Sequence, residues 1–167
     1  TGACCEISTG ACLGNLPEGD CLALGDTTWT VGADCVNGPF TCPPAPDGND
    51  CSIPVVVQVP GELAPDYVNV NTTCGRVDDY ENTCMGSYDG GEDIIYELVV
   101  TDPVCLEITL EADTIWGGLG LHDTCPLDAT TCIATATSSA NPNVISDLNL
   151  APGTYYLMAD TFPSPEC

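Results

Sequence analysis

Basic side chains are almost absent from this sequence. Its 167 residues include 25 Asp and Glu, one Arg, one His and no Lys, which gives a formal net charge of -24. Contacts with nucleic-acid phosphates need Lys or Arg, so this composition excludes nucleic acid as a partner. It also disfavours binding to anionic membranes. Two interpretations of the acidity remain open, solubility outside the cell and attraction of cations.

Long apolar runs and sustained helical periodicity are missing as well. No stretch approaches the roughly 20 apolar residues that a membrane-spanning helix needs, so we expect no membrane insertion. The sequence begins with TGACC and carries no signal peptide. We expect that an export signal was removed or lies outside this sequence.

Cysteine, by contrast, is abundant, with 13 residues. A reducing compartment does not favour so many cysteines. The spacings do not indicate zinc, because there is a single His and no paired CxxC motif. We therefore expect an extracellular protein, secreted or on the cell surface, with about six disulfides. Since 13 is odd, at least one cysteine is predicted to be free or to bridge to another chain.

Residues 1–44 are predicted to form a separate cysteine-rich, loop-rich module. The segment has little hydrophobic periodicity and many turn signals, and it is too short to bury a core of its own. Three disulfides can stabilise it, mainly by restricting the unfolded chain, but the sequence does not choose among the possible pairings. Residues 45–50 follow as a linker rich in Pro, Asp and Gly. The six cysteines of the module are Cys4, Cys5, Cys12, Cys21, Cys35 and Cys42.

Residues 51–167 are predicted to form an all-β domain. Residues 52–60 are a Val-rich run bounded by prolines, which favours an edge strand. Residues 94–100 are apolar on both faces except at Glu97, which indicates a central strand. Residues 154–159 contain two adjacent Tyr and give another strong strand.

Residues 105–111 alternate cleanly between apolar and polar side chains. Because Asp102-Pro103 marks a turn just before them, we predict that 94–100 and 105–111 pair as a hairpin. Short strands separated by turns predict an antiparallel β-sandwich. Weaker strand signals complete this pattern at residues 67–70, 114–121, 131–137 and 144–148.

Five motifs carry a resemblance to a known family: NTTCGRVDDYENTC, YDGGEDIIYEL, CLEITLEADT, LHDTCP and LAPGTYYLMAD. Their order and spacing across residues 51–167 resemble the bacterial pre-peptidase C-terminal (PPC) domain family. This resemblance implies a jelly-roll-like β-sandwich that serves as a non-catalytic accessory or binding domain of a secreted protein. Some related domains bind calcium. Family members usually continue into a final strand after the equivalent of PSPEC, so the resemblance implies that the last strand is missing here.

The N-terminal module resembles small cysteine-rich repeats of large exported bacterial proteins. The pattern that carries this resemblance is GACC, then TGAC, then DCLALGDTTW, then DC and TCP. It implies no activity. A spacer, an adhesive module and a simple stapled cap all remain open.

A short window with several glycines gathers five acidic side chains. Calcium binds about six to eight hard oxygens from flexible backbone, and such a loop supplies both carboxylates and carbonyls. We predict a structural calcium site, since a cation would relieve the repulsion among these carboxylates. The spacing is not that of an EF-hand loop, and solvated surface acids are the alternative. The five residues are Asp78, Asp79, Asp89, Glu92 and Asp93.

A catalytic site is not expected. His122 is the single candidate base, and it lies in LHDTC beside a predicted disulfide loop, without a nucleophile motif nearby. Asn71 begins an N-glycosylation sequon, Asn71-Thr72-Thr73, which matters only in a host that glycosylates such sites.

Two disulfides are predicted in the second domain, Cys74–Cys84 and Cys125–Cys132. Both loops are short and flanked by expected strands, so closing them costs little entropy. The two cysteines of each pair must still come within about 7 Å of one another.

Two functions follow from these features. The first is an extracellular structural protein, a subunit or repeat of a surface polymer or filament stabilised by disulfides and cations. The alternative is an accessory module that binds a polysaccharide or protein polymer for a secreted bacterial enzyme.

For the first function, we predict that copies of the chain or adjoining repeats associate by strand addition. If the last strand is missing, one edge beside 154–159 stays open and invites a strand from a neighbour. Residues 52–60 or the N-terminal residues are candidate donors. The unpaired cysteine would then lock the contact covalently.

Overall fold

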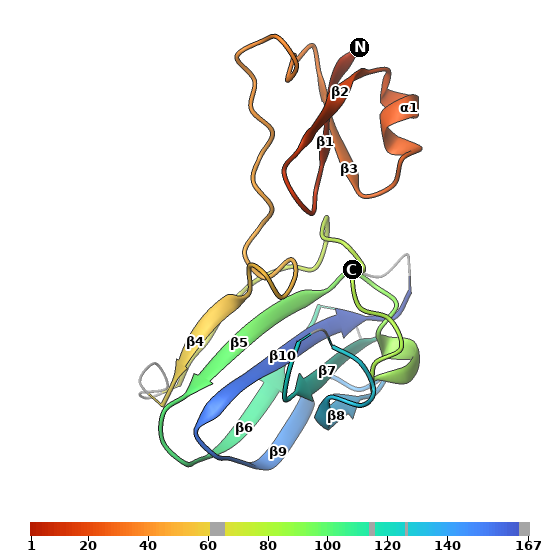
Figure 1. The fold of residues 1–167 in the computed structure, drawn as a ribbon. Coiled ribbons are helices and arrows are strands. Elements are labelled where there is room, and N and C mark those ends of the chain that lie inside the picture. Colours follow the sequence, from red (N-terminus) through yellow and green to blue (C-terminus); the bar gives the residue numbers. More distant parts are fainter. Residues whose placement is uncertain (61–65, 114–115, 126, 164–167) are drawn as a thin grey trace. The chain divides into compact units, whose positions relative to one another are not determined.

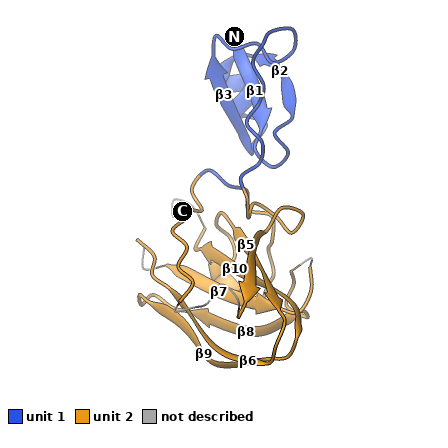
Figure 2. Ribbon diagram, turned by 90° about the vertical axis from the view of Figure 1, so that its left-hand side faces the viewer, with its two compact units in different colours: residues 1–46, 75–77 blue, residues 47–74, 78–167 orange. Residues whose placement is uncertain are grey.

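The computed structural model describes residues 1–60, 66–113, 116–125 and 127–163. It divides the chain into two compact units, which Figure 2 colours separately: residues 1–46 with 75–77, and residues 47–74 with 78–167. Apart from residues 75–77, the first unit thus ends in the proline-rich stretch after Cys42. No described helix is long and apolar enough to cross a membrane.

The first unit is a small three-stranded antiparallel sheet beside one short helix. Its central strand carries Ala3, Cys4 and Cys5, all almost fully buried. The core is therefore built largely from disulfide sulfur, which explains why hydrophobic periodicity did not reveal these strands. The elements are β1 (Gly2–Glu6), β2 (Cys12–Leu16), α1 (Glu18–Leu22) and β3 (Thr27–Val31), in the sheet order β2-β1-β3. The disulfides are Cys4–Cys21, Cys5–Cys42 and Cys12–Cys35.

The second unit is a β-sandwich, which confirms the predicted all-β fold. A five-stranded sheet in the order β4-β5-β10-β7-β8 faces a two-stranded sheet of β6 and β9, which lies behind it in Figure 1. One 3-10 turn, η1 (Gly86–Tyr88), precedes β5. The strands are β4 (Val55–Val59), β5 (Ile94–Val100), β6 (Val104–Leu110), β7 (Gly117–His122), β8 (Cys132–Thr137), β9 (Asn143–Leu150) and β10 (Gly153–Thr161).

Both faces of the larger sheet are buried along β5 and β10. On the face toward β6 and β9, Leu98 and Leu157 belong to the main apolar core. On the opposite face, Ile95 and Met158 pack with Met85 from a covering loop. Strands buried on both faces are expected to be apolar on both faces, as β5 is except at the half-buried Glu97, and its predicted central position is confirmed.

The strand β4 runs parallel to β5, whereas the other strand pairs are antiparallel. Parallel neighbours cannot be joined by a tight turn and need a long crossover. Here the crossover is the connection between Val59 and Ile94, which contains all five acids of the predicted calcium site. The position of β4 at the sheet edge agrees with the prolines around it.

Two predicted local elements are wrong. Strands β5 and β6 do not form a hairpin, because the turn at Asp102-Pro103 carries the chain from one sheet to the other and β6 pairs with β9. Residues 67–70 do not form a strand. Tyr67 packs on the core and Asn69 accepts a hydrogen bond from the Tyr96 hydroxyl (3.0 Å), but no backbone ladder follows.

The predicted open edge beside residues 154–159 is also wrong. Strand β10 has a neighbour on each side, β5 and β7, from the same chain. The unpaired edges among the described strands of this unit belong instead to β4, β8 and the two-stranded sheet of β6 and β9, hereafter the small sheet. The segment 164–167, on which the prediction of a missing last strand depends, lies outside the described residues.

Neither predicted disulfide of this unit forms. Cys84 pairs with Cys132, and Cys125 pairs with Cys51. Cys74 is also disulfide-bonded. Short spacing in sequence misled the prediction because the crossover and the loop after β7 meet over the outer face of the sheet, so each loop bonds to a distant segment. Among the described cysteines, Cys105 alone is free, and it is exposed.

Removing the Cys84–Cys132 bond by the double change Cys84→Ala/Cys132→Ala is expected to lower the free energy of unfolding by about 2–4 kcal/mol, because this bond closes a long loop of the unfolded chain. Urea denaturation measures the loss. Cys105→Ala, which removes a free and exposed cysteine, is the control and should change stability by less than about 0.5 kcal/mol. A peptide map of the non-reduced protein that joined Cys84 to Cys74 would contradict the assignment.

Candidate cation site

Two aspartates face each other at one end of the β5–β10 pair. The antiparallel register places Ile94 opposite Ala159. One step further along both chains, Asp93 therefore lies opposite Asp160. Both side chains point to the same outer face as Ile95 and are almost fully buried, with exposed fractions of 0% and 1%. Like charges directly opposite one another destabilise a strand pair, so this arrangement needs a compensating group.

Each of these carboxyl groups uses one oxygen and leaves the other without a donor. Asp93 accepts hydrogen bonds at Oδ2 from the backbone N–H groups of Asp79 (2.8 Å) and Tyr80 (3.0 Å). Asp160 accepts one at Oδ1 from the backbone N–H of Thr161. Asp93 Oδ1 and Asp160 Oδ2 are buried and have no hydrogen-bond donor. Two ionised carboxylates are acceptors only, so a proton or a cation is needed between them.

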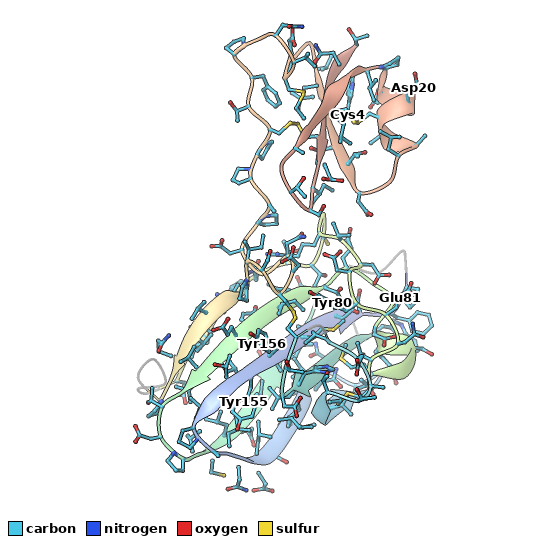
Figure 3. The ribbon with its side chains drawn as sticks, in the orientation of Figure 1. Cys4, Asp20, Tyr80, Glu81, Tyr155 and Tyr156 are labelled. Atoms are coloured by element: carbon cyan, nitrogen blue, oxygen red, sulfur yellow. A yellow bond between two sulfur atoms is a disulfide. The ribbon has the colours of Figure 1, made fainter. Side chains whose placement is uncertain are left out.

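The loop that supplies these donors is fixed at both ends. The Tyr80 hydroxyl oxygen accepts the backbone N–H of Cys51 (3.0 Å), which ties the loop to the Cys51–Cys125 disulfide. Figure 3 labels Tyr80 and Glu81 in this crossover connection. Gly91 passes so close to β10 that an added Cβ would lie 2.2 Å from Thr161 Oγ1 and 2.9 Å from Asp160 Oδ1. The backbone thus closes over the aspartate pair and limits access of water.

The electrostatics of the pair follow from burial. Desolvation, then the charge of Asp160, raises the pKa of Asp93 above its usual range. Desolvation also raises the pKa of Asp160, and the charges of Asp78 and Asp89 add to this rise. Without a cation, the buried pair therefore holds a proton that exposed aspartates would release.

The other predicted ligands are not brought into one cluster. Asp78 and Asp79 are exposed, and Glu92 is half-buried. Asp89 is buried, but its Oδ2 accepts the backbone N–H (2.7 Å) and the hydroxyl (2.8 Å) of Thr83, which closes a turn.

Sequence reasoning missed Asp160, which forms the pair with Asp93. The available signal was an aspartate inside the apolar strand LMADTF. That strand had to be paired with β5 in the correct register before the contact became visible.

The chemistry of the pair suits a hard cation. Calcium prefers carboxylate and carbonyl oxygens, and two buried carboxylate oxygens without donors are available here. Two cysteine-containing groups have ligand atoms within 4.8 Å of one another, Cys5/Cys35/Cys42 and Cys84/His122/Cys132. Their sulfurs are held in disulfides, so they offer no thiolate to a metal.

His122 is fully buried, and its Nδ1 lies 2.9 Å from the Thr131 hydroxyl. Burial lowers its pKa, which favours the neutral ring. These contacts give His122 a structural environment beside the Cys84–Cys132 disulfide. Asn71, the first residue of the sequon, is exposed.

Comparisons of the chain with family models, with curated proteins and with solved structures give no match. The assignment of a function therefore depends on the geometry of the site and on the chemistry of its residues.

The cation-free protein is expected to lose stability as pH rises from about 4 through neutrality. The pair binds protons in the folded state that the unfolded chain has released, so stability falls with pH. In Asp160→Asn, the amide can donate to Asp93 and remove the repulsion. With a chelator present, this variant should unfold at a higher temperature than the wild type at about pH 8, with a smaller difference at about pH 5.

The control is Glu107→Gln, which removes one charge at an exposed position of β6 and should change the melting temperature little. A variant Asp160→Asn that is destabilised equally at both pH values would contradict the account, because the pair would then be a simple structural contact.

Proposed function

We propose that this chain is an extracellular structural protein, a subunit or repeat of a disulfide-stabilised assembly that holds calcium at the Asp93–Asp160 pair. The disulfides indicate an oxidising environment of the extracellular type. Eleven of the cysteines that the structure describes are disulfide-bonded, in both units of the chain. This disulfide framework supports a structural role that requires resistance to unfolding.

The observation that favours assembly is the position of Cys105. It is free and exposed on β6 in a chain whose other described cysteines are oxidised. It lines a shallow groove of about 390 Å³ at the end of the small sheet, together with Asn149 and Leu150 of β9. An exposed thiol outside the cell can form a disulfide with a thiol of another chain. Two Cys105 thiols would form it by losing two protons and two electrons to an external oxidant such as dioxygen.

The small sheet also supports strand addition. Strand β6 pairs with β9 on one side, and no described strand pairs with its other edge. Leu106, Ile108 and Leu110 face the core from β6 but remain half-buried. A strand from a neighbouring copy at this edge would satisfy the open backbone groups and bury these side chains further. The proposed contact is therefore at β6 rather than beside β10.

Calcium contributes to the proposed function in two ways. At the Asp93–Asp160 pair it would replace the proton and join the crossover loop to β10. In solution it would also screen the repulsion between copies that each carry a formal charge of -24. The local effect needs specific ligands, whereas the screening effect needs only ionic strength.

Calcium titration by calorimetry is expected to give saturable binding, together with a rise in melting temperature. At a calcium concentration about 100 times the Kd, the stabilisation is about 2.7 kcal/mol. Asp93→Asn and Asp160→Asn should each abolish the heat of binding. Asp79→Asn should retain it, because the backbone N–H of Asp79 serves the pair. Equal binding by all three variants, or no heat with the wild type, would reject the site.

Cys105→Ser is expected to abolish covalent dimers that the wild type forms at high protein concentration in air. Non-reducing electrophoresis with light scattering measures them. The matched control adds the exposed thiol elsewhere, in Cys105→Ser/Ser139→Cys. If β6 directs the contact, this control should crosslink at least about tenfold less than the wild type, since orientation raises the effective concentration of the thiols. Equal crosslinking would show random oxidation and contradict assembly at β6.

A further inference from the structure

The single Trp and the single Phe of residues 47–167 meet on the surface of the sandwich. The ring centroids of Trp116 and Phe162 are 5.8 Å apart, and Tyr88 lies 6.4 Å and 6.2 Å from them. The backbone N–H of Phe162 donates to the carbonyl of Trp116 (2.9 Å), which fixes the two segments side by side. We call these three side chains the aromatic platform.

The aromatic platform remains exposed to solvent although its three rings pack against one another. Trp116 and Phe162 are each 39% exposed. Tyr88 is half-buried, and its Cβ lies against Gly118 of β7, where an added Cβ would come within 3.1 Å. The glycine thus leaves room for the ring that supports the other two. Large aromatic side chains that pack on one another and still face solvent are typical of a binding surface.

A polar hollow lies in the loop that carries Tyr88. Its volume is about 400 Å³, and it is lined by Glu81, Asn82, Thr83, Gly86, Asp89 and Gly90. Tyr88 lies between the two glycines in sequence, and Gly90 approaches Pro163, the residue after Phe162. None of the three platform residues lines the hollow, but its carboxylate, amide and hydroxyl groups lie in the same loop as Tyr88. Exposed aromatic side chains with a few polar groups nearby are the usual composition of a small-ligand site.

We propose that the aromatic platform, together with polar groups of the loop that carries Tyr88, binds an uncharged hexose polymer. The C–H faces of pyranose rings stack on aromatic rings, and sugar hydroxyls both donate and accept hydrogen bonds, which suits Glu81 and Asn82. The charged side chains lining the hollow are acidic, and the chain has a formal charge of -24, so acidic glycans are repelled. This binding activity is independent of assembly at β6 and of the aspartate pair.

The test uses a chitin hexasaccharide and a cellulose hexasaccharide as probes, measured by calorimetry and by tryptophan fluorescence on the whole chain. At least one is expected to bind, and Trp116→Ala and Phe162→Ala should each weaken that binding at least roughly tenfold. Val144→Ala is the matched control, because Val144 is exposed to a similar degree (38%) on β9. Polygalacturonic acid, an acidic glycan, should not bind.

Three results would overturn the proposal: no binding of either hexasaccharide, binding that survives both aromatic substitutions, or equal binding of the acidic glycan. Self-association that is lost in Trp116→Ala, without any glycan binding, would instead identify the platform as a contact between copies. Melting curves of the variants separate loss of a ligand contact from loss of the fold. Repeating the hexasaccharide titration in the presence of a chelator separates glycan binding from calcium binding.

Discussion

The pairing of β5 with β10 is the interaction on which the rest of the second unit depends. These two strands contribute side chains to both apolar cores, one on each side of the sheet. Their register ends at Ile94 and Ala159, and the next residues, Asp93 and Asp160, bring their side chains within hydrogen-bonding distance of each other. The stable core thus forces two carboxyl groups together at its end. The crossover loop supplies N–H donors to one of them, so the loop geometry and the charge pair depend on each other.

Much of this fold was predictable because it follows from local patterns. The apolar stretch 94–100, the alternation in 105–111 and the tyrosine-rich stretch 154–159 all form strands where expected. Pairing was harder, since the partner of a strand depends on contacts distant in sequence. The turn at Asp102-Pro103 is compatible with a hairpin or with a change of sheet, and burial of both faces of β5 favours the second. The resemblance to the PPC family stays a prediction.

The candidate site was predictable only in part. The acidic window identified the correct loop, and it included Asp93. It did not identify Asp160, which becomes a neighbour through β-pairing rather than through sequence proximity. The disulfide prediction was wrong for the same reason. Cys84 bonds to Cys132 and Cys125 bonds to Cys51, because loops that are distant in sequence meet over the sheet. Charge density alone does not distinguish an exposed acid such as Asp78 from a buried one such as Asp93.

The central claim is that a cation replaces a proton held between Asp93 and Asp160. Calcium titrations near neutral pH, in buffers with different ionisation enthalpies, measure the protons released on binding. The account predicts the release of about one proton per calcium ion by the wild type. Calcium binding without proton release would contradict it, since the buried carboxyls would then already be fully ionised in the cation-free protein.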